Sequence, residues 1–339
     1  MSVIKDLARP YYISFFDFIR KKVLGIDLII NFLKDYLLYK RYSIIFKNKD
    51  LENKEADIIL NYHSLEKGML FKNMKKGFAA YRIRNLHKLL KDKEIMNNCN
   101  RSQIRVGYQL MCQYYELHQN AGFEIENLFS AEQYNFYKSI LKSNYDNHFN
   151  GIKEWTKESF FKSNRDPFEV FAFTRKSTRN FTGELISKEI LNKVITLANT
   201  APSVCNRQAN SVYLLQDKTK IDKALKIQGG FEGYTEGVSQ LLILTNNRKY
   251  YYTVGERNQF YIDGGVYLMN LLYALHYYKV GNCPANWGKT YAEEKALAKI
   301  ISLPESEKII CFIPIGKLPD KFRSTLSKRR TCNENFKMI

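Results

Sequence analysis

The chain has 339 residues, 45% of them hydrophobic, and a formal net charge of +19, so it can bury a large core in one or two domains. The charge is spread evenly, with 28 basic and 18 acidic residues before position 166 and 25 and 16 from there on. No polybasic tail or stripe stands out, so we expect no nucleic-acid partner, whereas the charge favours anionic cofactors, substrates or membrane surfaces.

The six cysteines form no C-x-x-C pair and have no regular spacing, so we expect neither a disulfide framework nor a metal site. Free cysteines fit a reducing cytoplasm, and the first residues lack the order of a signal peptide. The apolar run Val23–Tyr39 is interrupted by charges and is shorter than a membrane span. We expect an amphipathic helix there, packed in a core, joined to a dimer interface or lying on a membrane as a peripheral contact.

Residues 1–165 are expected to form a mostly helical N-terminal domain, because apolar residues recur there at helical spacing and strand-like alternation is hard to find. The helical stretches are Ile4–Tyr39, Asp50–Lys67, Tyr81–Lys91, Ser102–His118 and Ala131–Leu141. The pair Asp166-Pro167 marks a boundary, since proline disfavours helix in the residue before it.

Residues 166–339 mix helices with short strands, which predicts an α+β domain with three α/β/α layers. Ser187 is a good N-cap for a helix that runs to about Asn199. Strands are predicted at Ser211–Gln216, Gln240–Thr245 and Ile309–Ile315, and a long apolar helix at Asn258–Tyr278. The glycine-rich segment 229–237 precedes a strand, so it does not match a dinucleotide fingerprint. We interpret it as an ordinary connection, with a mobile loop near the substrate as the alternative.

The segment Arg175-Lys-Ser-Thr-Arg179-Asn-Phe181 is the most informative part of the sequence. Arg175, Ser177 and Arg179 would present two guanidinium forks and a hydroxyl to one phosphate. The alternative is a solvated basic helix end. Farther along, Lys328-Arg329-Arg330 would supply a second set of cations, or else form a solvated tail.

Four segments together resemble the FMN-dependent nitroreductase family, over about residues 166–335. They are the one at Arg175, then Ala201–Gln208, then Asp263-Gly264-Gly265 with Cys283–Trp287, and finally Lys328–Arg330. The resemblance implies an FMN enzyme that takes hydride from NADH or NADPH, forms a homodimer through its long helix, and passes the hydride to an electron-poor small-molecule acceptor.

The residues expected to bind FMN are Arg175, Lys176, Ser177, Arg179, Pro202, Ser203, Asn206, Gln208, Pro284, Trp287, Lys328 and Arg330. The resemblance places Asn206 at the polar edge of the flavin ring, where its amide both donates and accepts hydrogen bonds. Trp287 would cover a ring face or belong to the core. No catalytic side chain is required, because the flavin carries the chemistry.

Residues 1–165, which we call the helical front, are the part of the chain that departs from the compact form of the family. There, His63 and Glu66 lie on one helix face, and Gly68 is expected to end the helix as its C′ residue. The segment His63–Phe78 would either form a lid over the flavin pocket, with His63 and Glu66 as lid residues, or only cap the helix. Long family members with a similar segment resemble proteins associated with surface-polysaccharide synthesis. The alternatives for the function are an FMN-dependent dehydrogenase of a biosynthetic intermediate and a non-catalytic flavin-binding protein.

Overall fold

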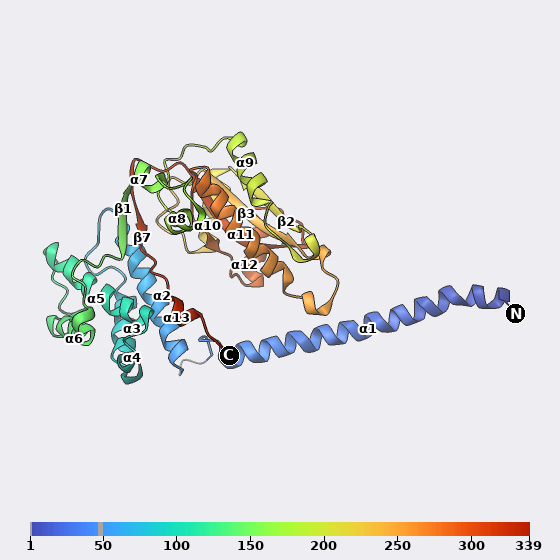
Figure 1. Cartoon of the computed structure of the whole chain (residues 1–339), viewed down its shortest axis with the longest axis horizontal. Coiled ribbons are helices and arrows are strands. Elements are labelled where there is room, and N and C mark those ends of the chain that lie inside the picture. Colours follow the sequence, from blue (N-terminus) through green and yellow to red (C-terminus); the bar gives the residue numbers. More distant parts are fainter. Residues whose placement is uncertain (1, 47–49) are drawn as a thin grey trace.

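The computed structural model describes residues 2–46 and 50–339. Its first element, α1 (Ser2–Tyr42), is a single helix that runs away from the rest of the chain (Figure 1). Large apolar side chains between residues 18 and 42 are exposed, among them Val23, Ile29 and Leu33. Packing in a core of this chain is therefore wrong for Val23–Tyr39, and the dimer and membrane-surface alternatives stay open. Within the described residues, no helix has both the length and the hydropathy of a membrane span.

The helical front is built from five helices around one apolar core. Their bounds are α2 (Leu51–Met69), α3 (Ala80–Leu90), α4 (Lys93–Asn97), α5 (Ser102–Asn120) and α6 (Ala131–Leu141). All four helices predicted in this stretch are present. The core is dense in aromatic groups, with Tyr108, Phe129 and Tyr137 fully buried, and α5 is buried along most of its length. Such a core forms a rigid base for α2, which faces the second half of the chain.

A strand that the sequence does not predict joins the front to the chain's end. It is β1 (Ile152–Thr156), which pairs antiparallel with β7 (Lys321–Thr325), so that Trp155 lies opposite Phe322. The mostly helical expectation for residues 1–165 does not include this strand. The reason is that only Ile152 and Trp155 are even partly buried, so the segment lacks the alternation that identifies a strand. The ladder crosses the boundary predicted at residue 165.

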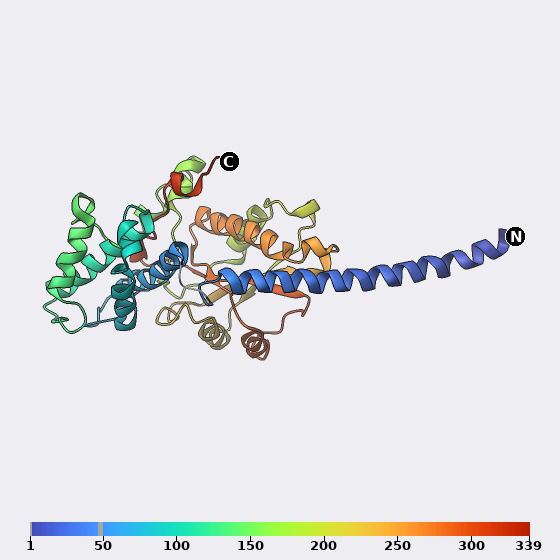
Figure 2. The ribbon, with the colours of Figure 1, turned by 90° about the horizontal axis from the view of Figure 1, so that it is seen from below.

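The second half is a five-stranded antiparallel sheet between two layers of helices. The strands are β2 (Asn210–Leu215), β3 (Gln240–Asn247), β6 (Glu307–Gly316) and β4 (Gly281–Asn282), in that order, with β5 (Ala285–Asn286) also paired to β6. One face packs on α9 (Lys188–Ala198) and α11 (Gln259–Tyr277), and the other on α10 (Lys218–Gln228) and α12 (Tyr291–Ala298). Figure 2 shows α11 on one side of the sheet and α10 and α12 on the other.

Side-chain alternation along β3 explains the layers. Leu242 and Leu244 join the core under α9 and α11, whereas Leu241 and Ile243 join the core under α10 and α12, as period-two geometry requires. The predicted α+β class with three layers is confirmed. Ser187 caps α9 as expected, with its side chain accepting from the Ile190 N–H. The remaining helices are α7 (Lys157–Phe161), α8 (Phe168–Thr174) and α13 (Cys332–Asn335).

Candidate functional site

The segment that follows α8 runs extended beside β4. The Thr178 N–H donates to the Asn282 carbonyl at 2.8 Å, and the Thr178 side chain is fully buried. Because side chains alternate along an extended chain, Arg175, Ser177 and Arg179 share the face opposite Thr178. All three lie near the buried Cys283, and burial raises the pKa of the Cys283 thiol. The fold thus brings together the three groups that we predicted from the sequence to act on one phosphate.

These cations lack anionic partners within the described residues. Nη1 of Arg175 and both Nε and Nη1 of Arg179 are buried without a hydrogen-bond partner, although buried N–H groups are nearly always paired. Burial lowers the pKa of Arg175, and the charge of Arg329 lowers it further. The pKa of Lys176 is lowered in the same way, by burial first and then by Arg329 and Arg175. The arrangement repels itself and is suited to an anion with several acceptor oxygens.

A further cation comes from the helical front. Lys67, in the last turn of α2, has its pKa lowered by burial and then by the neighbouring Arg179. We call Lys67, Arg175, Lys176, Arg179 and Arg329 the cation cluster. Sequence reasoning missed Lys67 because nothing local links α2 to a segment more than 100 residues later. The sequence analysis considered Arg329 only as part of the basic run Lys328–Arg330.

The C-terminal residues of the predicted site divide between two roles. Arg330 makes a bidentate ion pair with Glu55, with Nη2–Oε2 and Nη1–Oε1 distances of 2.9 and 3.1 Å, and Glu55 is only 1% exposed. The guanidinium of Arg330 is therefore already engaged by the protein. Its neighbour Arg329 is the one whose charge reaches the cation cluster. Lys328 is exposed, and its carbonyl accepts from Gln103 Nε2 at 3.4 Å.

The predicted flavin loop, residues 201–208, is held in an uncommon backbone conformation. Cys205, Asn206 and Gln208 all have positive φ, of 47°, 54° and 49°, which costs energy for residues other than glycine. The buried carboxylate of Asp263 supports the loop by accepting from the Val204 N–H at 3.3 Å. The side chains of Asn206 and Gln208 are exposed and joined by a hydrogen bond of 3.1 Å. Pro202 is exposed, and Ser203 Oγ accepts from the Gln208 N–H.

The loop and the cation cluster lie toward opposite ends of α11 in one chain. Asp263 is in the second turn of the helix, whereas Arg175 lies near Tyr273 and His276. Ten or more residues of α-helix separate these points by about 15 Å. Between them α11 exposes an apolar stripe that includes Ile262, Val266 and Met269. Gly264 faces the sheet instead, since a Cβ there would lie 2.6 Å from Ile310 Cγ1.

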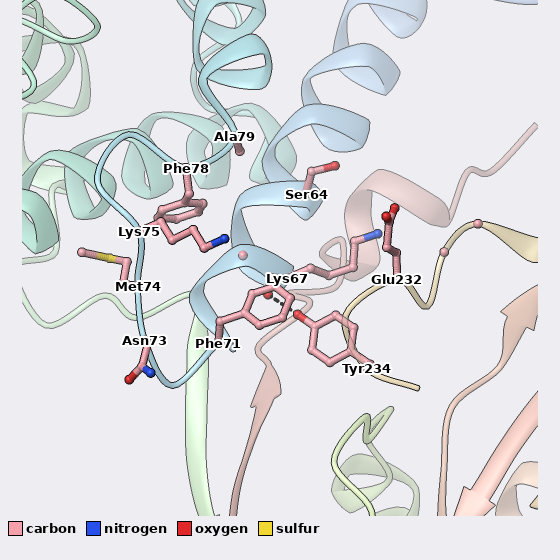
Figure 3. Close-up of a pocket in the computed structure, with 13 residues that line it drawn as sticks. Ser64, Lys67, Phe71, Asn73, Met74, Lys75, Phe78, Ala79, Glu232 and Tyr234 are labelled. Carbon is pink, nitrogen blue, oxygen red and sulfur yellow. Dashed lines mark hydrogen bonds between the residues drawn. The ribbon is translucent and has the colours of Figure 1, made fainter. Parts of the chain in front are cut away.

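A cavity of about 460 Å³ opens between the helical front and the glycine-rich segment (Figure 3). The rings of Phe71 and Tyr234 stack at 4.8 Å, and the Tyr234 hydroxyl donates to the Lys67 carbonyl at 2.6 Å. Residues 229, 230, 232 and 234 also line the cavity, which favours the alternative of a loop near the substrate for the segment 229–237. Gly233 lets the Phe71 ring approach, because a Cβ there would lie 2.8 Å from it.

The segment predicted as a lid, His63–Phe78, contributes several residues to the wall of this cavity, and its role as a lid stays a prediction. Ser64, Lys67, Gly68, Phe71 and Phe78 line the cavity, and His63 and Glu66 are not among its lining residues. His63 Nδ1 contacts Glu66 at 2.9 Å as expected.

The predicted helix end at Gly68 is wrong, because α2 continues through Met69. A Cβ at position 68 would meet Phe78 Cε2 at 2.4 Å. This glycine therefore makes room for an aromatic ring.

Trp287 has a core position. It is 4% exposed, packs on Phe312 with ring centroids 4.5 Å apart, and donates from Nε1 to Glu294 at 3.3 Å. The indole lies in the core between the sheet and α10 and α12, so of the two roles weighed for it the structure gives the core one. Pro284, which directly precedes β5, is partly buried.

Comparison with known proteins adds a family to this geometry. The nitroreductase family model matches residues 172–232, a stretch that contains both the Arg175–Arg179 segment and the 201–208 loop. A search of the curated proteins found no match.

Among solved structures, the chain is similar to an FMN-dependent nitroreductase from Clostridium difficile, with 15% identity, 48% of this chain and 90% of that chain covered, and a TM-score of 0.38. It is also similar to NfrA2 from B. megaterium, with 19% identity, 44% and 66% covered, and a TM-score of 0.39. A third similar structure is a candidate nitroreductase in complex with FMN from Desulfovibrio desulfuricans, with 20% identity, 51% and 96% covered, and a TM-score of 0.44. The family match and the motifs it spans identify the C-terminal half of the chain as a nitroreductase-family domain.

Proposed function

We propose that the protein binds FMN and transfers hydride from NADH or NADPH, through the flavin, to an electron-poor small-molecule acceptor. The observation that carries the proposal is the set of buried, unpartnered guanidinium groups of Arg175 and Arg179, which lie within the segment that the family model matches. A phosphate dianion would supply the missing acceptors, since guanidinium groups bind phosphate oxygens in pairs.

The residues fit an FMN molecule in two parts. Arg175, Lys176, Ser177 and Arg179 would hold the phosphate, joined by Arg329 from the chain's end. The exposed amides of the 201–208 loop would donate to and accept from the polar ring edge. When bound, the flavin supplies the hydride chemistry, and the role left to this chain is to bind it, orient it and exclude water from its reactive face.

A homodimer is part of the proposal. The cation cluster and the loop lie about 15 Å apart along α11, and the helix exposes Ile262, Val266 and Met269 between them. An apolar stripe of this kind favours a protein partner. A second copy packed there would bring its own loop beside the first copy's cluster, so that each flavin site would draw on both chains.

The cavity under the helical front is the proposed place for the acceptor. It adjoins the cation cluster, because Lys67 lines it and both Lys67 and Tyr234 lie near Arg179. The stacked rings of Phe71 and Tyr234 suit a planar, electron-poor molecule. The resemblance of the His63–Phe78 segment to long family members would place this reaction in surface-polysaccharide biosynthesis.

Two alternative functions would use the same site. An FMN-dependent dehydrogenase would oxidise a biosynthetic intermediate, with oxygen reoxidising the flavin, and a binding protein would hold flavin without turnover. Anaerobic addition of NADH or NADPH to the flavin-loaded protein separates the proposed function from both alternatives. The proposal predicts rapid bleaching of the flavin, then recovery of colour when a quinone or nitroaromatic acceptor is added. A bound flavin that neither nicotinamide reduces would overturn the hydride-transfer step and leave the other two functions.

A further inference from the structure

The last residues of the chain form a strap, residues 326–335, that crosses the helical front. The Leu326 N–H donates to the Gly151 carbonyl at 2.8 Å, and the Ser327 N–H donates to Glu66 Oε1 at 3.2 Å. Farther along, the Ser102 N–H donates to Glu334 Oε1 at 3.1 Å. The strap is thus hydrogen-bonded to elements that lie more than 170 residues earlier in the chain.

Two buried carboxylates on α2 anchor the strap. Glu55 and Glu66 are each 1% exposed. Glu55 accepts from Arg330, and also from Arg101 Nη2 at 2.6 Å, while Glu66 accepts from the Ser327 main chain. Eleven residues bring an α-helix back to nearly the same face about 16 Å farther along. Both anchors therefore lie on the face of α2 that the strap crosses.

Arg329 lies between the two anchored positions. Its Nη1 donates to the Ser327 carbonyl at 3.0 Å, and its charge lowers the pKa of both Arg175 and Lys176. Arg329 is exposed to solvent in the structure. Like charges repel each other, so an unfixed Arg329 would move away from the other cations when no anion is bound. The anchors on either side of it oppose that movement, because it would break the bidentate Arg330–Glu55 pair and the hydrogen bond from the Ser327 N–H to Glu66.

We propose that Glu55 and Glu66 are positioning residues for the flavin phosphate: they fix the strap so that Arg329 completes the cation cluster. This inference rests on the proposed binding of FMN. It gives the helical front a defined task, since two of its buried carboxylates then set the affinity for the phosphate without touching it. Linkage requires the reverse effect too, so a bound phosphate should tighten the strap on the front.

The test compares FMN with riboflavin, which has the same ring and lacks the phosphate. Binding of each is followed by flavin fluorescence in Glu55→Gln, Arg330→Met and Arg329→Ala. All three variants should bind FMN at least tenfold more weakly and riboflavin as the unaltered protein does. The double variant Glu55→Gln with Arg329→Ala should lose no more than Arg329→Ala alone, because both changes remove the same contact.

The matched control is Lys54→Gln, the neighbouring position on α2. Lys54 Nζ binds Asp92 and Glu94, both 2.9 Å away and both within the front, so FMN affinity should not change. Arg330→Met keeps the Glu55–Arg101 pair and covers the case in which Glu55→Gln does not fold. Unchanged FMN affinity in Arg330→Met, or an equal loss for riboflavin, would overturn the inference. An unaltered protein that binds neither flavin would instead overturn the proposed function, and the inference with it.

Discussion

Replacing Arg175 by Met should change stability and flavin affinity in opposite directions. Nη1 of Arg175 is buried without a partner, which costs about 1–3 kcal/mol in the flavin-free protein. Met keeps an apolar stem of similar length and removes the charge that Arg329 repels. We therefore expect Arg175→Met to raise the free energy of unfolding of the flavin-free protein by about 1 kcal/mol, or about 2–4 °C in Tm.

The same change should weaken FMN binding. A charge-assisted contact is worth about 1.5–3 kcal/mol, which corresponds to a loss of about 10–150-fold in affinity. Thermal melts with and without FMN, combined with fluorescence titration, measure both effects on one sample. A variant that melts earlier and binds FMN normally would refute the reasoning, because Arg175 would then be a structural residue.

Three further predictions concern other parts of the chain. Gly68→Ala should lower Tm by several degrees, since its Cβ would meet Phe78 at 2.4 Å, and should alter acceptor KM; an unchanged melt would contradict this. Burial lowers the pKa of His276 to about 4, so between about pH 6.5 and 4 only the unfolded state takes up its proton. As the pH is lowered through this range, the free energy of unfolding should fall by roughly 1.4 kcal/mol per pH unit. His276→Gln should flatten that part of the curve of unfolding free energy against pH, and the same slope in the variant would refute the role given to His276. Removing residues 1–42 should leave FMN affinity unchanged in titration, because α1 is tied to the domain mainly near Arg257; a large loss would place α1 in the site.

Local signals predicted the elements of the fold well. The Ser187 cap, the apolar runs of β3 and β6, and the helical periodicity of α5 and α6 depend on neighbours a few residues apart. For that reason they can be read from sequence. β1 could not be, because it is a strand only by pairing with residues about 170 positions later. Its own side chains carry no alternation.

The site was predictable where one segment carries it. Arg175, Ser177 and Arg179 were predicted to act together because they lie within five positions of one another, and the extended chain found there puts them on one face. The sequence could not show which of Arg329 and Arg330 joins the cation cluster. That depends on Glu55, which lies 275 residues before Arg330 and binds it. Lys67 and the cavity wall at Tyr234 were missed for the same reason: they meet the site only through packing between the two halves.

Flavin occupancy tests the central claim most directly. We predict that the unaltered protein, loaded with FMN and freed of excess ligand, retains about one FMN per chain. The double variant Arg175→Met with Arg179→Met, treated in the same way, should retain almost none. Riboflavin should be retained far less well than FMN, because the cation cluster binds the phosphate. A colourless protein that takes up no added FMN at micromolar concentration, or one that holds FMN and riboflavin equally, would contradict the account.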